Sequence, residues 1–218
     1  MWEKLIDIFE YNSKHQKINF YIDSETDKLI FTLNGFVQYI TGEDETNYHE
    51  ALTRPLLDKG YTKFLILGGG DGLVARNIFR SIPKADITLI DLDEDVVNIH
   101  KNQEELKKLN EGSLDKCKIY NEDALIWIEK DHITMYNGIV LDFPDPTTQD
   151  LCQLYNVRFL EKIKHILNGT ITMQVNSDYV DRIYNYYFSQ LFKNTKINYY
   201  NMPNLGENCT ILEGENNV

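Results

Sequence analysis

Short apolar runs alternate with amphipathic stretches over most of this chain, beginning at Lys63. The runs "KFLIL", "DITLI" and "NGIVL" are rich in branched residues and predict buried strands. The segments between them, such as "DGLVARNIFRSI" and residues 94–109, repeat apolar positions at helical spacing. Three later runs, "TITMQVN", "KINYYN" and "CTILEG", predict the last strands. Strands that alternate with helices indicate an α/β fold with a doubly wound, mostly parallel sheet.

The first part of the chain has a different pattern. Residues 17–40 gather apolar and β-branched residues around two polar turns, one over residues 24–27 and one at Asn34-Gly35. This segment is too small to hold a core alone, so we expect a β-appendage packed on the main domain. The appendage is expected to cover residues 1–45, as an N-terminal helix and a β-hairpin, and the main domain residues 46–218. Residues 46–58 predict a linking helix that Pro55 interrupts or kinks.

The bulk composition narrows the classes of function. The 218 residues carry a net charge of −12, which disfavours nucleic acid as a partner and favours cations, including polyamines. The cysteines, Cys117, Cys152 and Cys209, are scattered, so we expect neither a metal site nor a disulfide framework. No signal peptide is visible and no run reaches the ~18 apolar residues of a membrane helix. We therefore expect a cytoplasmic protein that does not bind membranes.

Acidic residues stand where the predicted strands end, the edge at which such sheets bind ligands. The first strand runs into the glycine turn "GGGDG", and the second ends at Asp91, ~20 residues later, as in folds whose acid holds a ribose. The third predicted strand, "KCKIYNED", leads to Asp123, placed to accept a hydrogen bond from an adenine amine. Each feature also has a plainer explanation: a simple strand–helix turn for the glycines, a solvated acid for Asp91, and a helix N-cap for Asp123.

The fourth strand ends in "LDFPDP", where Asp142 and Asp145 alternate with Pro144 and Pro146. A turn followed by a helix cap would explain this pair alone. Acids at four consecutive strand ends, however, favour a binding site over coincidence.

Asp71 stands inside the glycine turn, where dinucleotide-binding folds aim a helix N-terminus at a phosphate. A fixed carboxylate there repels phosphate, and it equally repels the carboxylate of S-adenosylmethionine. It attracts an ammonium group. The turn therefore favours an adenosine compound with a cationic tail.

Four motifs, "LILGGGDG", "LIDLDEDVV", "NEDAL" and "VLDFPDP", follow one another in the order and spacing of the spermidine synthase family, the polyamine aminopropyltransferases. Upstream, "LNGFVQYITGEDETNYHEAL" is similar to that family's hairpin and Tyr-His-Glu segment. The sequence most resembles the bacterial branch with a Pro-Asp-Pro motif. The resemblance runs from about His15 to the C-terminus.

This resemblance implies a small N-terminal β-domain on a Rossmann-like catalytic domain of the class I methyltransferase type, assembled as a homodimer. It implies decarboxylated S-adenosylmethionine as co-substrate, whose tail is an aminopropyl ammonium without a carboxylate, and no metal or other cofactor. The acceptor is a diamine or polyamine, with putrescine as the default and spermidine as its product.

The resemblance also assigns residues. Asp91 would hold the ribose of the donor, and Asp123 with Ala124 the adenine. Tyr48 and His49 match a Tyr-His pair beside the transferred group, although from the residues alone a core tyrosine and a surface histidine explain them better. The donor-contacting positions are Gln16, Gly68, Gly70, Asp71, Asp91, Asp123 and Ala124, and Asp71 is also expected near the acceptor.

By position, Asp142 matches the family's catalytic aspartate, which accepts the proton or a hydrogen bond of the attacking amine. Alkylamines have a pKa of ~10.4 and a normal aspartate ~3.9, so a carboxylate is a weak base for that proton. We therefore expect Asp142 mainly to orient the amine and to stabilise its developing charge. Asp145 would bind the cationic acceptor.

Two segments depart from the family's common pattern, Thr147-Thr148-Gln149 and "MPNLGEN". Both fall where acceptors bind, so putrescine, cadaverine and spermidine all stay open. One alternative is an S-adenosylmethionine-dependent methyltransferase, in which Arg76 would have to neutralise the donor's carboxylate. Another is a non-catalytic protein that binds polyamines or nucleosides.

Overall fold

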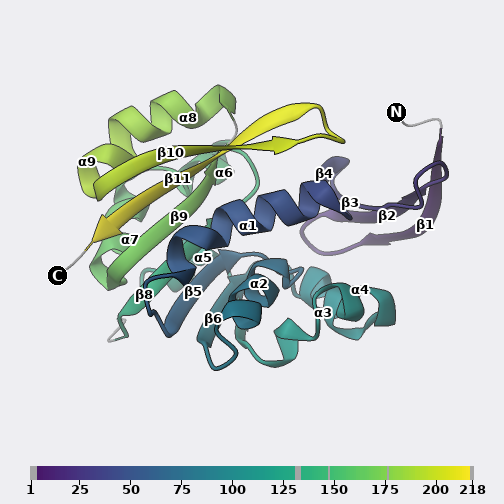
Figure 1. Ribbon diagram of the computed structural model, residues 1–218, viewed down its shortest axis with the longest axis horizontal. Helices are drawn as coiled ribbons and strands as arrows, with labels where there is room; N and C mark the ends of the chain where they lie inside the picture. Colours follow the sequence, from purple (N-terminus) through teal and green to yellow (C-terminus); the bar gives the residue numbers. More distant parts are fainter. Residues whose placement is uncertain (1–3, 131–133, 147, 176, 217–218) are drawn as a thin grey trace.

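The main sheet has seven strands in the order β10-β11-β9-β8-β5-β6-β7 (Figure 1). The computed structural model describes residues 4–130, 134–146, 148–175 and 177–216. Strands β9, β8, β5, β6 and β7 are parallel, whereas β10 and β11 are antiparallel additions at one edge. The expected α/β class with a mostly parallel sheet is therefore confirmed. The strands of this sheet are β5 (Lys63–Gly68), β6 (Asp86–Asp91), β7 (Lys118–Asn121), β8 (Tyr136–Asp142), β9 (Leu167–Val175), β10 (Lys193–Met202) and β11 (Glu207–Asn216).

Helices cover both faces of this sheet because its strands are apolar on both sides. In β5, Leu65 and Leu67 join one core cluster while Phe64 and Ile66 join another. The first cluster packs under α5, α7, α8 and the π-helix η3, and the second under α1 and α2. The helical segments are α1 (Glu43–Leu57), α2 (Leu73–Ser81), α3 (Glu94–Asn102), α4 (Glu104–Leu109), η2 (Ser113–Asp115), α5 (Ala124–Trp127), α6 (Gln149–Gln153), α7 (Val157–Ile166), α8 (Ser177–Ile183), η3 (Tyr184–Phe188) and α9 (Ser189–Leu191).

Residues 94–109 form two helices, α3 and α4, where the periodicity predicts one. The break lies at Gln103, whose backbone is extended (φ −76°, ψ 126°). Val96 and Leu106, one on each helix, both pack in the cluster beneath the small N-terminal sheet. In a straight helix, residues ten apart differ by about 80° around the axis. The break therefore allows both side chains to face the same partner.

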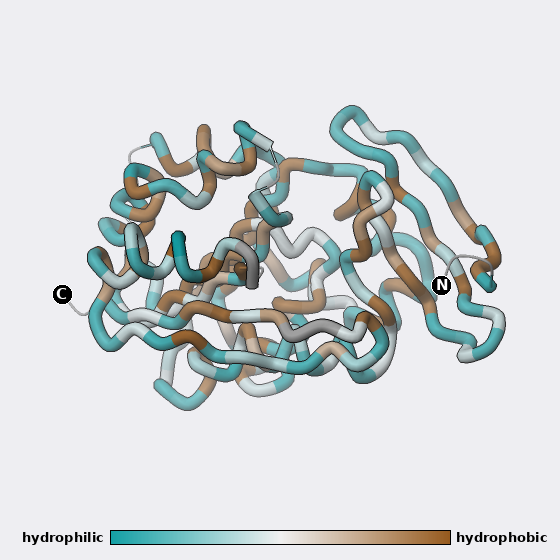
Figure 2. Tube along the Cα trace, turned by 90° about the horizontal axis from the view of Figure 1, so that it is seen from above, coloured by the Kyte–Doolittle hydropathy of each residue, from teal (hydrophilic) through white to brown (hydrophobic). Residues whose placement is uncertain are grey.

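The N-terminal region is a four-stranded antiparallel sheet, β1-β2-β3-β4, beside α3 and α4 (Figure 1). This sheet lies at one end of the molecule (Figure 2). The expected N-terminal helix is wrong: Leu5–Asn12 form β1, which pairs with β2 along its length, so this segment takes its structure from cross-strand pairing. The turn at Asn34-Gly35 is confirmed, with φ of 52° and 81°. The strands are β1 (Leu5–Asn12), β2 (Lys17–Asp23), β3 (Leu29–Leu33) and β4 (Phe36–Ile40).

Helix α1 links the two sheets and begins three residues earlier than the sequence pattern indicates. Pro55 does not interrupt it. The proline lies in the last turn, where its missing N–H removes one hydrogen bond near the helix end. In the described part of the chain, no helix has the length and apolar character needed to cross a membrane.

Candidate active site

The carboxyl ends of β5 and β8 lie side by side, at the point where the strand order reverses. Gly68 at the end of β5 pairs with Asp142 at the end of β8. On the other side, Asp91 at the end of β6 pairs with Asn121 of β7. In doubly wound sheets this reversal is where ligands bind. The acids that the sequence assigned to separate strand ends therefore share one edge.

The glycine turn passes between two of these carboxylates. Gly70 N donates to Asp91 Oδ2 at 2.9 Å, and a Cβ added there would lie 2.6 Å from that oxygen. A Cβ at Gly69 would lie 3.3 Å from Asp142 Oδ2. Gly68 has φ +84°, and a Cβ there would lie 2.0 Å from the Asp142 carbonyl oxygen. The glycines are thus needed by the protein's own close packing.

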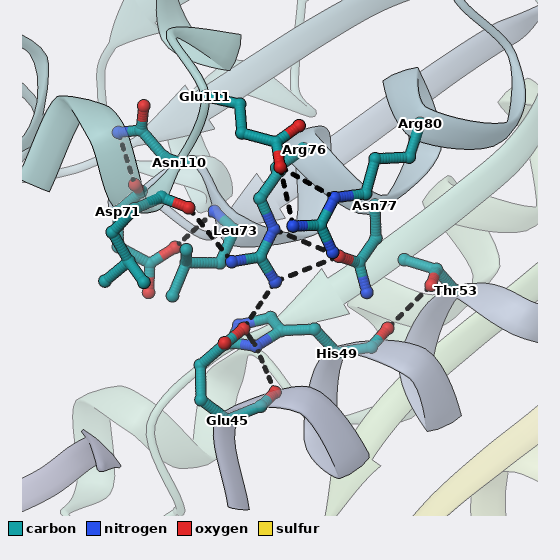
Figure 3. A network of polar contacts seen from close by, with 12 residues as sticks. Glu45, His49, Thr53, Asp71, Leu73, Arg76, Asn77, Arg80, Asn110 and Glu111 are labelled. Carbon is teal, nitrogen blue, oxygen red and sulfur yellow. Dashed lines mark hydrogen bonds and ion pairs between the residues drawn. The ribbon is translucent and has the colours of Figure 1, made fainter. Parts of the chain in front are cut away.

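Asp71 lies where the sequence predicts it, in the turn before α2. Its Oδ1 accepts a hydrogen bond from Leu73 N at 2.9 Å, and its carbonyl accepts one from Asn110 Nδ2 at 3.1 Å (Figure 3). The first contact orients the carboxylate and the second holds the backbone of the turn. Its charge raises the pKa of Asp91 and of Asp142, so the structure brings these three acids into one electrostatic group.

Asp91 bridges two loops and is partly buried. Its carboxylate accepts hydrogen bonds from Gly70 N and from Asp93 N, each at 2.9 Å. Desolvation, helped by the charges of Asp71 and Asp93, raises its pKa to about 6 against the two N–H donors, which lower it. A cationic ligand group, or ribose hydroxyls that donate hydrogen bonds to this carboxylate, would offset part of the cost of desolvating its charge.

Gln16 reaches this region from the loop between β1 and β2. Its Nε2 donates to Asp93 Oδ2 at 2.9 Å, and Ser13 Oγ donates to the same oxygen at 2.6 Å. Asp93 is buried and also caps α3 through Asp95 N. Asp93, which the sequence analysis did not single out, therefore ties the small sheet to the loop after β6.

Asp123 and Ala124 lie at the start of α5. Asp123 Oδ1 accepts from Leu125 N at 2.8 Å, so the helix-cap interpretation of this aspartate is correct. Ala124 is buried. Glu122 N donates to the Asp91 carbonyl at 3.0 Å, which fixes this loop beside the end of β6. An adenine-binding role is compatible with this cap and stays a prediction.

Tyr48 of α1 donates a hydrogen bond from its hydroxyl to Asp142 Oδ1. Desolvation and, after it, the charge of Asp71 raise the pKa of Asp142 to about 6, although His49 and the Tyr48 hydrogen bond act in the opposite direction. Sequence spacing alone could not pair two residues 94 positions apart.

Asp145 contacts a residue that the sequence analysis missed. Gln174 Nε2, from β9, donates to Asp145 Oδ1 at 3.3 Å. The intervening loop is also held by Tyr155 Oη, which donates to the carbonyls of Phe143 and Pro144 at 3.2 and 2.9 Å. Rigidity here comes from Tyr155 as well as from the prolines. Of the altered segment that follows, Thr147 lies outside the described residues.

His49 is buried, so its interpretation as a surface histidine is wrong. Its Nδ1 lies 2.9 Å from Glu45 Oε1, and that oxygen also pairs with Arg76 Nη2 at 2.5 Å (Figure 3). Burial opposes the charge of Glu45, but its hydrogen bonds to His49 and Arg76 dominate and lower its pKa to about 2. Arg76 further donates to Asn77 Oδ1 and to the Leu109 carbonyl. Glu45, His49 and Arg76 therefore form a buried network of fixed charges near the strand ends that carry the acids.

This network bears on the methyltransferase alternative. That alternative needs Arg76 to neutralise a donor carboxylate near Asp71. Arg76 is instead 3% exposed, and its guanidinium is engaged by Glu45, Asn77 and the Leu109 carbonyl. Freeing it would leave Glu45 as a buried, partly unpaired charge.

A family model described as "Spermine/spermidine synthase domain" matches residues 45–215. The chain is 36% identical over 159 residues to "Polyamine aminopropyltransferase 1" of Streptomyces coelicolor, a match covering 71% of this chain and 29% of that protein. It is 33% identical over 196 residues to "Polyamine aminopropyltransferase" of Oceanobacillus iheyensis, covering 87% and 38%. The chain therefore spans about a third of the length of these curated relatives.

Among solved structures, the chain is similar to spermidine synthase from Thermotoga maritima, with a TM-score of 0.82 and 20% identity, covering 97% of this chain and 73% of that one. It is equally similar to a spermidine synthase in complex with the transition-state analogue AdoDATO, with a TM-score of 0.83, 20% identity, and coverage of 97% and 74%. At this level of identity, the similarity establishes the shared fold.

Proposed function

Because this chain belongs to the spermine/spermidine synthase family, we propose that it transfers the aminopropyl group of decarboxylated S-adenosylmethionine to an amine and releases methylthioadenosine. The observation that carries the proposal is the hydrogen bond from Tyr48 to Asp142, beside the carboxylate of Asp71. An enzyme that joins two cationic substrates needs such a negative site to bring them together.

The donor would lie along the carboxyl ends of β5, β6 and β7. In this proposal Asp91 holds the ribose hydroxyls, and Asp123 with Ala124 borders the adenine. Gln16 completes the site from the small sheet, fixed by its hydrogen bond to Asp93. Gly68 and Gly70 supply the backbone turn on which the donor lies.

Asp71 would select the decarboxylated donor. Its carboxylate attracts the aminopropyl ammonium and repels the carboxylate that S-adenosylmethionine retains. Arg76, the cation nearest in sequence, is engaged by Glu45 and so does not counter this repulsion. Charge discrimination of this kind favours one donor by excluding the other.

The reaction is an in-line displacement. The lone pair of the acceptor nitrogen forms a bond to the carbon attached to the sulfonium, the C–S bond breaks, and its electrons stay on sulfur as the neutral thioether of methylthioadenosine. The nitrogen then releases a proton. With a pKa of about 6, Asp142 is a stronger base than an ordinary aspartate, yet still far weaker than an alkylamine of pKa ~10.4. Its main contribution is therefore to orient the amine and to stabilise charge that develops on nitrogen.

The acceptor would enter between Tyr48 and Asp145. Tyr48 packs edge-on against the His49 ring with centroids 4.8 Å apart, and the buried Glu45 fixes that histidine. Asp145 would bind the distal ammonium of the acceptor, with Gln174 orienting its carboxylate. Putrescine is the default acceptor.

A product assay tests this proposal. Purified protein is incubated with decarboxylated S-adenosylmethionine and, in separate reactions, putrescine, cadaverine or spermidine, and the products are identified by mass spectrometry. We expect a lengthened polyamine with one of these amines, and the fastest reaction identifies the acceptor. No lengthened amine with any of them would refute the proposal.

Four finer statements belong to the same proposal. They are a homodimeric state, a cytoplasmic location, membership of the bacterial branch with a Pro-Asp-Pro motif, and a division into an appendage (residues 1–45) and a catalytic domain (residues 46–218). Light scattering coupled to size exclusion would test the first, and limited proteolysis followed by mass spectrometry the last.

A further inference from the structure

We propose that Tyr200 is an acceptor-binding residue, whose hydroxyl accepts a hydrogen bond from an N–H of the incoming amine. This inference rests on the proposed function. Tyr200 lies on β10, an antiparallel strand outside the parallel strands whose ends carry the acids. The motifs that identify the site do not include it.

Tyr200 reaches the site from the side of helix α1. Its ring packs against the Tyr48 ring, with centroids 5.8 Å apart, and, partly buried, it packs against the core cluster beneath α1. In the sheet register it is opposite Cys209 of β11, two residues before Ile211, which pairs with Gln174. The tyrosine is thus a near neighbour of the residues that hold Asp142 and Asp145.

The hydroxyl of Tyr200 is buried and, within the described residues, has no hydrogen bond to an oxygen or nitrogen atom; its neighbour is the Cys209 thiol. Burial raises the pKa of this phenol far above its usual range, and the Cys209 thiol, Asp142 and Asp145 raise it further. The hydroxyl is therefore protonated and lies within the electrostatic field of both carboxylates. A thiol is a weak hydrogen-bonding group, so it leaves the oxygen's main bonding capacity for a ligand.

An amine fits this surrounding better than other ligand groups. Gln174 Oε1 is a second buried oxygen without a hydrogen-bond partner in the described part of the chain, and its amide nitrogen is engaged by Asp145. Two acceptor oxygens beside two carboxylates match an ammonium, which carries three N–H donors and no acceptor. Tyr48 already donates its hydroxyl to Asp142, so Tyr200 supplies the additional oxygen.

The test compares Tyr200→Phe with Tyr199→Phe. Each substitution removes one phenol hydroxyl from adjacent positions on β10, but Tyr199 is 69% exposed. Both tyrosines line a groove of about 650 Å³ between α1 and β10, so the Tyr199 variant controls for effects of that groove. For Tyr200→Phe we expect the KM for the amine to rise by about tenfold, as for loss of a hydrogen bond to a charged group, with the KM for the donor unchanged. Tyr199→Phe should match the wild type in both.

The outcomes separate this inference from the proposed function. If the wild type transfers the aminopropyl group and Tyr200→Phe retains the wild-type KM for the amine, the hydroxyl does not bind the amine and the inference is overturned. If the wild type transfers nothing, the proposed function fails. Calorimetric titrations of putrescine and spermidine into the wild type and into both variants then decide the inference. Weaker amine binding to Tyr200→Phe alone then supports it, whereas equal binding, or none to the wild type, overturns it.

Discussion

The hydroxyl of Tyr48 donates a hydrogen bond to Oδ1 of Asp142, and this contact joins helix α1 to the carboxyl end of β8. The same aspartate is partly buried. This desolvation and the charge of Asp71 raise its pKa to about 6. A carboxylate held in this way is oriented for one task, but its ionised form is unfavourable unless a cation lies beside it. Several expectations follow from that tension.

Asp142→Asn should lower kcat by about a hundredfold to ten-thousandfold, the range for loss of an orienting or proton-accepting group. Donor affinity should change little, because the donor is held mainly by the ends of β5, β6 and β7. Stopped assays for turnover and calorimetry for donor binding measure the two effects. Asp181→Asn, at an exposed position on α8, is the control. Full turnover by Asp142→Asn would remove this residue from the mechanism.

The same substitution should make the free protein more stable at pH 8. Because the folded pKa of Asp142 lies above its unfolded value of ~3.9, ionisation of the carboxyl opposes folding increasingly from about pH 4 and fully above about pH 6. Asparagine removes this charge, which should raise the free energy of unfolding by about 1–3 kcal/mol in urea titrations. Below about pH 3 the wild-type carboxyl is protonated in both states, so the difference should disappear. A less stable variant at pH 8 would contradict the assigned burial.

Donor affinity should fall as the pH drops through about 6. Asp91, with a pKa of about 6, then takes up a proton and loses the charge that attracts the sulfonium and ammonium groups of the donor. Between pH 7 and pH 5 we expect the Kd of the decarboxylated donor to rise by about tenfold. The affinity for neutral methylthioadenosine should fall less. Equal losses for the two ligands would show that the charge of Asp91 does not attract the donor.

The buried ion pair of Arg76 and Glu45 should matter far more than an exposed pair on the same helix. Arg76→Ala leaves Glu45 buried without its main partner and should lower the free energy of unfolding by about 3–5 kcal/mol. Arg80 pairs with Glu111 at 2.6 Å, but both side chains are about half exposed. Arg80→Ala should therefore lower it by only about 0–1 kcal/mol. Similar losses in urea titrations of both variants would refute the structural role given to Arg76.

The acids at the strand ends could be predicted from the sequence because a strand end is a local feature. An apolar run followed by an acid is visible in "LIDLD" and "IVLD", and parallel strands bring such ends together. The helix cap formed by Asp123 is equally local, which is why its plainer interpretation was also correct.

The partners of these acids could not be predicted, because they come from distant elements. Glu45 and Arg76 lie 31 residues apart on different helices, and nothing in either segment indicates that they meet. Tyr200 is one of 14 tyrosines, and only the pairing of β10 with β11 brings it to the site. The N-terminal strand was mistaken for a helix for the same reason, since its structure depends on β2.

The most direct measurement is a single-turnover reaction with enzyme in excess over decarboxylated S-adenosylmethionine and the preferred amine present. Quenched samples are analysed for methylthioadenosine and for the lengthened amine, with S-adenosylmethionine as the control donor. We expect the two products in equal amounts and no adenosylhomocysteine from the control. Methylthioadenosine without the lengthened amine, or adenosylhomocysteine from the control donor, would contradict aminopropyl transfer directed by Asp71 and Asp142.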